Sequence, residues 1–226
     1  MQGEGADASA GYHGYWITAF TEIDPHLGGN EALRDLVDAA HERGIEVYFD
    51  IITNHTADVI DYAEGEYSYI DSATSPWVAT DGTEYDAAAL DAVAGSEQFP
   101  EFDADGFPYT PVRPEGSPVM VPDWLNDVTV YHNRGDSTWS GESVTYGDFV
   151  GLDDLMTEDP RVVDGFTEIY QAWMDFGIDG YRIDHPDGLA APRGYLRDLD
   201  RATGGAWTVV EKILEPHETL PAGSRC

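Results

Sequence analysis

The chain has 226 residues, of which 42% are hydrophobic, so it can form a substantial core in one or two domains. It carries 44 acidic against 11 basic residues, and its formal net charge of −33 argues against nucleic acid and anionic membranes as partners. No run of about 18 apolar residues predicts a membrane span. The single cysteine, Cys226, excludes an intrachain disulfide.

A helix followed by a strand is predicted in the first quarter of the chain. Apolar residues recur at helical spacing after Asn30, which we expect to be the N-cap, and Gly44 ends this helix. Residues 45–52 then form an apolar run that is typical of a buried strand.

The same order returns near the end of the chain. Asp159 and Pro160 predict a helix start, and the apolar face that follows leads into a predicted strand over residues 178–184. A shorter helix and a strand over 207–211 come next. Helices that alternate with buried strands predict an α/β fold with a parallel sheet.

Residues 56–155 interrupt this alternation. They are rich in Gly, Pro, Asp, Ser and Tyr and have no long helical period. Because about 100 residues without regular elements are uncommon as a loop, we expect an inserted, irregular domain that contains β-structure.

Charged residues at two strand ends suggest a reaction. Arg182 and Asp184 lie two apart, so on a strand their side chains share a face, and the arginine is expected to lower the pKa of the aspartate. An ionised carboxylate held at a strand end suits a nucleophile, although a structural ion pair is an equally good interpretation of this segment alone. Glu211 ends the next strand, so it should meet Asp184 at the same sheet end. Carboxyls about 5–5.5 Å apart are the apparatus of retaining glycoside hydrolysis.

Five segments, in order, resemble signature segments of the α-amylase superfamily: residues 12–16, 50–55, 151–155, 180–184 and 210–211. The resemblance implies an incomplete (β/α)8 TIM barrel with an irregular inserted domain after the third strand. We therefore expect three parts: barrel residues 1–55, an inserted domain B at 56–155, and barrel residues 156–226 with the fourth and fifth strands. Because the later strands and the third catalytic acid of the family are missing, the chain is expected to be truncated at both ends of the barrel.

The resemblance also implies roles for single residues. Asp184 would be the nucleophile and Glu211 the acid and base, with Arg182 beside them. Contacts to the substrate would come from His13, Tyr15, Trp16, His55 and His185. Asn54 and Asp154 would hold a structural calcium ion, and Asp50 would be structural. The partner would be an α-glucan or maltooligosaccharide, with no nucleic acid and no membrane, and we expect a monomer. Three tryptophans of the insertion, Trp77, Trp124 and Trp139, are candidate sugar platforms, but core packing is the expected role for most of them.

One departure leaves the reaction open. Most α-amylases have a lysine–histidine pair where this chain has Asp187 and Gly188. Residues 185–189 and 210–214 instead resemble maltooligosyl trehalose synthase, a superfamily member that isomerises a terminal α-1,4 bond to α,α-1,1. The alternatives are hydrolysis of α-1,4-glucan, this isomerisation, or an inactive hybrid or fragment that at most binds glucan. The first favours an extracellular location and the second a cytoplasmic one.

Overall fold

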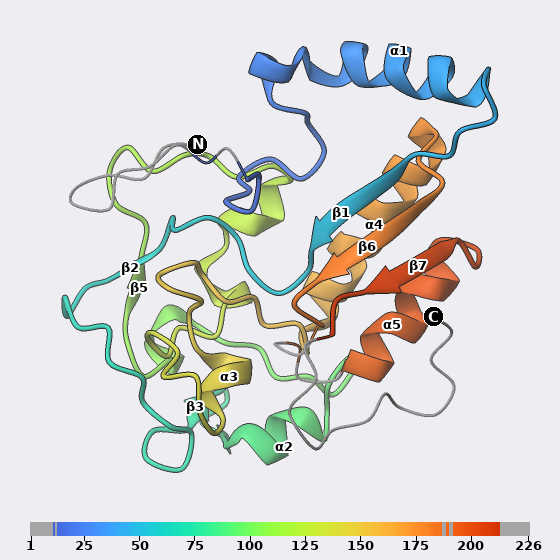
Figure 1. Ribbon diagram of the computed structural model, residues 1–226. Coiled ribbons are helices and arrows are strands. Elements are labelled where there is room, and N and C mark those ends of the chain that lie inside the picture. The colour runs from blue at the N-terminus through green and yellow to red at the C-terminus, as the bar shows by residue number, and fades with distance from the viewer. Residues whose placement is uncertain (1–10, 12, 187–188, 190–191, 213–226) are drawn as a thin grey trace.

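A parallel sheet of three strands carries the strand ends that the sequence singled out. The computed structural model describes residues 11, 13–186, 189 and 192–212. The strand order is β1 (Tyr48–Ile52), β6 (Gly180–Asp184), β7 (Trp207–Val210), and all neighbours are parallel. Figure 1 shows the arrowheads of all three strands pointing toward the segment between β1 and α4 (Pro160–Phe176), which fills the left and lower part of the view.

Each strand follows a helix, as the sequence predicted. The helices are α1 (Gly29–His41), α4 (Pro160–Phe176) and α5 (Pro192–Ala202). Helix α4 begins where the sequence predicted, because the side chain of Asp159 accepts a hydrogen bond from the backbone N–H of Arg161. Gly177 ends this helix in the left-handed conformation, with φ of 114°.

The predicted N-cap of the first helix is wrong. Gly28 occupies the cap position, with φ of 101°, and makes no side-chain cap. The side-chain oxygen of Asn30 instead accepts a hydrogen bond from the backbone N–H of Ile23 at 2.8 Å. The side-chain amide of Asn30 therefore stabilises the loop before the helix instead of capping the helix. That loop holds the single-turn helix η2 (Pro25–Leu27).

The last strand is more exposed than a buried strand should be. Trp207, Val209 and Val210 all expose more than a third of their surface. The strand has one neighbour, β6, in the part of the chain that the structure describes, so it is an edge strand, as is β1 on the other side. The middle strand is the most buried of the three, with Tyr181 and Ile183 fully covered, and the end of β1 buries Ile51 and Ile52.

The main core joins the sheet and helices α1, α4 and α5 with residues of the segment between β1 and α4, such as Val59, Leu125 and Tyr131. Its largest members include Phe166, Tyr170, Trp173 and Tyr181. A cavity of about 480 Å³ lies beside β1 and is lined by this strand, α4 and the loop before α1. Among the described residues, no helix is long and apolar enough to cross a membrane.

The segment between Ile52 and α4 consists of short elements around a second core. Two antiparallel pairs form within it: β2 (Asp61–Tyr62) with β5 (Pro111–Val112), and β3 (Trp77–Val78) with β4 (Glu84–Tyr85). Its helical turns are α2 (Ala87–Asp91), η3 (Ala104–Gly106), η4 (Asp123–Asn126), η5 (Val128–Val130) and α3 (Ser143–Tyr146). The second core gathers Trp77, Leu90, Phe102, Phe107, Tyr146 and Met156. The domain boundaries at residues 55 and 155 stay a prediction.

Candidate active site

Arg182 contacts three carboxylates at the carboxyl end of the sheet. Its Nη1 donates to Oδ1 of Asp50 at 2.8 Å and to Oδ1 of Asp184, and its Nη2 lies 3.4 Å from Oε2 of Glu211. The strand register explains this meeting, because Asp50 pairs with Arg182 across β1 and β6, and Glu211 directly follows β7. The structure therefore brings Asp184 and Glu211 to one guanidinium, as the parallel-strand argument predicts.

The pKa values of Asp184 and Glu211 are shifted in opposite directions, and the shift of Asp184 is opposite to the predicted one. Burial raises the pKa of Asp184, and the hydrogen bond and charge of Arg182 only oppose this effect, while the nearby Glu211 adds to it. The expected lowering of the Asp184 pKa is therefore wrong. The pKa of Glu211 is lowered, first because the backbone N–H of His185 donates to its Oε2 at 3.1 Å, and further by Arg182.

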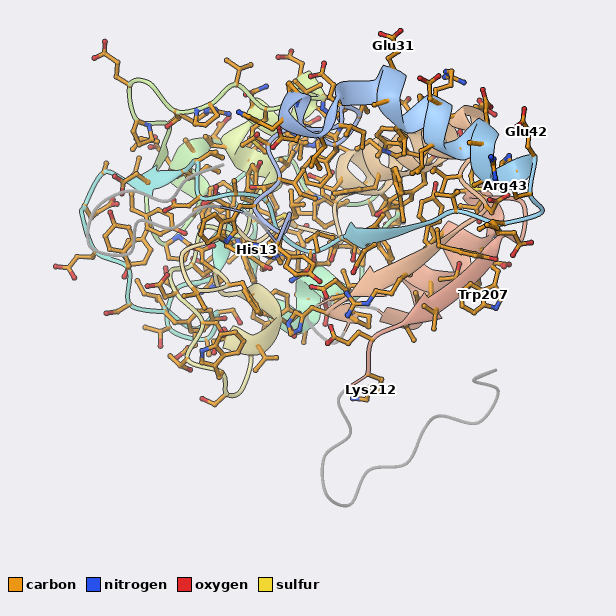
Figure 2. All side chains as sticks on the ribbon, turned by 45° about the horizontal axis from the view of Figure 1, so that its top comes forward. His13, Glu31, Glu42, Arg43, Trp207 and Lys212 are labelled. Atoms are coloured by element: carbon orange, nitrogen blue, oxygen red, sulfur yellow. The ribbon has the colours of Figure 1, made fainter. Side chains whose placement is uncertain are left out.

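The aromatic segment near the start of the chain lies at the same strand end. The hydroxyl of Tyr15 donates to Oδ2 of Asp50 at 3.4 Å, and the backbone N–H of Tyr15 donates to Nδ1 of His13 at 3.0 Å. The His13 ring lies 5.5 Å from the Tyr15 ring and 4.6 Å from the Trp16 ring, measured between centroids. Figure 2 shows His13 near the tips of the strand arrows, whereas Trp207 lies at the other end of the sheet.

His55 lies beneath an aromatic ring instead of on an open surface. It is 2% exposed and stacks on Phe149 at 5.2 Å between centroids, with 6° between the rings. Burial lowers its pKa to about 4, so the imidazole is neutral near pH 7. His185 contacts the same Phe149 ring at 5.0 Å. A sugar contact by His55 in this arrangement requires Phe149 to move, and its predicted role stays a prediction.

Phe149 was missed by sequence reasoning. The residue precedes the segment at 151–155 that resembles the superfamily, so its position close to that segment was the one signal available. Nothing in the local pattern says that its ring packs between two histidines from different strand ends.

The two predicted calcium ligands lie on adjoining backbone segments. The backbone N–H of Leu155 donates to the backbone oxygen of Asn54 at 2.8 Å. The backbones of Asp154 and His55 form an isolated antiparallel β-bridge. The Asn54 Oδ1 atom is buried and has no hydrogen-bond partner among the described residues, which suits an oxygen ligand of a hard cation. Asp154 fits less well, because its Oδ2 is 2.6 Å from Nδ1 of His132. The described residues contain no group of three or more His, Cys, Asp or Glu side chains that could hold a metal ion.

Two of the three tryptophans are packed inside, as expected for most of them. Trp77 is fully buried, and the Trp124 ring lies against the backbone of Gly165 in α4, where a Cβ would come within 2.4 Å of the indole. Trp139 is 53% exposed. The departures at Asp187 and Gly188 lie outside the described residues.

Helix–strand pairs in a parallel sheet, with the charged residues at the carboxyl ends of the strands, are the pattern of a (β/α)8-barrel enzyme. Comparison with known proteins agrees. The family model for "Alpha amylase, catalytic domain" matches residues 5–203. The chain belongs to the α-amylase family, and its fold is part of a (β/α)8 barrel.

Individual relatives match different shares of the chain. An alpha-amylase of Streptomyces lividans is 56% identical over 186 residues, which cover 81% of this chain and 20% of that protein. A putative maltooligosyl trehalose synthase of Mycobacterium tuberculosis is 29% identical over 230 residues, covering 92% of this chain and 29% of the relative.

A solved structure shows the same fold. The alpha-amylase of Malbranchea cinnamomea superposes with a TM-score of 0.58 at 24% identity, over 94% of this chain and 35% of that one. The chain thus spans between about a fifth and about a third of the length of these proteins.

Proposed function

We propose that this chain supplies the nucleophile and the acid/base of a retaining enzyme that hydrolyses α-1,4-glucosidic bonds in starch or maltooligosaccharides. The observation that carries the proposal is the single guanidinium of Arg182, which contacts both Asp184 and Glu211 at the carboxyl end of the sheet. Family membership supports it, because the matched model is that of an alpha-amylase catalytic domain.

In the proposed reaction, a carboxylate oxygen of Asp184 attacks the anomeric carbon, and the bond from that carbon to the glycosidic oxygen breaks. Glu211 gives its proton to the departing oxygen and becomes a carboxylate. It then takes a proton from water, whose oxygen displaces Asp184 from the same carbon. Two displacements at one carbon retain the α configuration.

The protonation states needed for attack differ from those that the pKa values favour without substrate. Attack needs an ionised Asp184 and a protonated Glu211, whereas burial raises the first pKa and the His185 N–H lowers the second. A sugar bound between the carboxyls would break the hydrogen bond from the His185 N–H to Glu211. It would also separate Arg182 from Glu211, so that Arg182 contacts Asp184 alone of the two. Both changes move the proton toward Glu211.

The remaining predicted residues would place the sugar. Tyr15, His13 and Trp16 come from one aromatic segment whose tyrosine hydroxyl already reaches Asp50 beside Arg182. His185 and His55 would contribute from the other side, through the loop that follows β6 and the end of β1. The substrate is a neutral glucan, which the acidic surface does not repel, and the same net charge of −33 opposes self-association and supports a monomer.

We further propose that residues 56–155 are the inserted domain B of this barrel and that calcium joins it to the barrel. Asn54 and Asp154 would hold the ion, which would supply a fixed positive charge between the end of β1 and the insertion. The unpartnered Asn54 Oδ1 supports the idea. Calcium should raise the unfolding midpoint of the wild type but not of Asn54→Ala, compared after treatment with a chelator. An equal response in both proteins would contradict the site.

The second candidate function is maltooligosyl trehalose synthase-type transglucosylation, in which a sugar hydroxyl replaces water in the second step. A similarity to a putative enzyme of that name over 92% of this chain favours keeping it. Product analysis with maltopentaose separates the two reactions. Shorter reducing oligosaccharides support hydrolysis, a non-reducing product of unchanged length supports isomerisation, and unaltered maltopentaose supports a fragment that at most binds glucan.

A further inference from the structure

Trp139 combines an exposed indole with an unusual backbone conformation. The side chain is 53% exposed, and its φ of 59° lies in the left-handed region that residues with a Cβ rarely adopt. The Oγ of Ser137 accepts a hydrogen bond from the Trp139 backbone N–H at 3.2 Å and helps to hold this turn. Burial of the ring does not offset the strain, and such strained positions cluster at functional sites.

The Trp139 ring is connected to the catalytic strand end through Phe149. Its edge packs on the Phe149 ring at 4.9 Å between centroids, with 83° between the planes. Phe149 in turn contacts His185, which follows Asp184 and donates its backbone N–H to Glu211. The His55 ring stacks parallel to Phe149 on another side, so the Phe149 ring contacts three other rings. These contacts connect the Trp139 indole, through the Phe149 ring, to the residue that directly follows Asp184.

The other large exposed tryptophan shows that exposure alone is not the argument. Trp207 is 57% exposed and packs edge-on against Tyr48 at 5.0 Å. It is the first residue of β7, whereas Glu211 follows the last one, and Figure 2 shows Trp207 at the end of the sheet opposite to His13. Trp207 has the same chemistry and a similar exposure at the other end of the sheet, and it therefore serves as a matched control.

We propose that Trp139, supported by Phe149, is a stacking platform for a glucose unit of the glucan chain next to the units at the reacting bond. An exposed flat indole offers apolar surface to the C–H face of a pyranose ring, and fixed aromatic rings bind at low entropic cost. A neutral polyhydroxylated ligand also suits an acidic protein, which would repel an anionic one. The inference rests on the function proposed above and names a further part of the same site.

Calorimetric titration with maltoheptaose tests the proposal. All proteins carry Asp184→Asn, so that the ligand is not consumed, and Trp139→Ala, Trp139→Leu and Trp207→Ala are compared in that background. We expect Kd to rise roughly tenfold or more in both Trp139 variants and to stay within twofold in Trp207→Ala. Trp139→Leu keeps an apolar side chain and loses only the flat ring, so it separates stacking from general hydrophobic contact. Trp139→Phe should restore most of the affinity.

The possible results lead to different conclusions. If the Asp184→Asn background protein binds no maltoheptaose, the proposed function fails and the platform with it. If the background protein binds and both Trp139 variants bind equally well, the platform alone is wrong. An equal loss in the Trp139 and Trp207 variants would also overturn it. Unfolding midpoints of all variants are measured alongside, and Trp139→Leu provides the test if Trp139→Ala is unstable.

Discussion

The sheet end and the inserted segment each hold a cluster in which one cation joins several carboxylates, but the two clusters differ in exposure. Arg182 is 31% exposed in its side chain, and its three acidic partners all keep contact with solvent. His132 is 1% exposed and lies between Asp154 at 2.6 Å and Glu158 at 3.0 Å, both of which are also buried.

The electrostatics of the two clusters follow from this difference. Burial opposes protonation of His132, yet Glu158 and Asp154 raise its pKa to about 10, which favours a charged imidazole. Burial raises the pKa of Asp154 to about 8 against the opposing effect of His132, so Glu158 is the stronger charged partner. The imidazole contacts the buried side chains of Asp154 and Glu158 and has almost no contact with solvent. The carboxylates around Arg182 keep an accessible side, which is what a reaction with a bound sugar needs. The open cluster is thus suited to chemistry and the closed cluster to holding the insertion together.

The largest expected effect is on the open cluster. Asp184→Asn removes the nucleophile, and we expect hydrolysis of maltopentaose to fall at least about 10³-fold in kcat/KM. The unfolding midpoint should change little, because Arg182 keeps its contact with Asp50. Asp198→Asn changes a partly exposed carboxylate of α5 that pairs with Arg201; it is the matched control and should keep full activity. Activity of Asp184→Asn within tenfold of the wild type would remove Asp184 from the mechanism.

The closed cluster should respond in stability. In calcium-free buffer, His132→Gln leaves Asp154 and Glu158 buried without their cation, and we expect the free energy of unfolding to fall by about 3–5 kcal/mol in urea titrations. His26→Gln breaks a similar histidine–aspartate contact, His26 to Asp24 at 2.7 Å, that lies on the surface. This control should show no measurable change. Equal stability of the two variants would mean that burial does not distinguish the clusters.

A change at the centre of the open cluster should alter both the reaction rate and its pH dependence. Arg182→Lys keeps the charge but loses the planar fork that reaches Asp184 and Glu211 together, so we expect kcat/KM to fall about 10- to 100-fold. Because Arg182 opposes the raised pKa of Asp184, weaker contact should raise that pKa further. The acid limb of the pH–activity profile should therefore move to higher pH. A limb that stays in place while activity falls would show that Arg182 acts only on geometry.

The sequence predicted the sheet end better than its surroundings. The two-residue spacing of Arg182 and Asp184 and the parallel order of the strands were enough to bring Glu211 to them, because strand geometry is local and regular. The pKa of Asp184 was not predictable in the same way. It depends on how much the rest of the fold buries the carboxyl, and burial outweighs the arginine.

Contacts across the insertion could not be predicted from the sequence for a related reason. His132 meets Asp154 and Glu158 through an irregular chain path, with no periodicity to show which turn lies against which. The same holds for the Phe149 ring between His55 and His185. The first helix cap was missed because Asn30 has two possible uses, and tertiary contact with the loop before it decided between them.

Asp179 lies outside both clusters, has a side-chain exposure of 29% that is close to that of Arg182, and gives the smallest expected effect. It precedes β6, and its Oδ2 accepts from the backbone N–H of Val47 at 2.6 Å and contacts Nε2 of His41 at 2.9 Å, so it ties the end of α1 to the sheet. Slight burial works against ionisation, but these two partners lower its pKa from 3.8.

A lowered pKa in the folded state means that the carboxylate stabilises the protein above the unfolded pKa and loses this effect as pH falls through the folded value. Asp179→Asn should therefore reduce the free energy of unfolding at pH 7 by less than about 1 kcal/mol, since the side chain is partly exposed. The difference from the wild type should shrink below about pH 4, when measured by urea titration at pH 7 and pH 3. A loss that persists unchanged at pH 3 would show that the neutral acid stabilises the fold through shape and hydrogen bonding. The exposure of a carboxylate would then not determine how much it contributes to the free energy of unfolding in this fold.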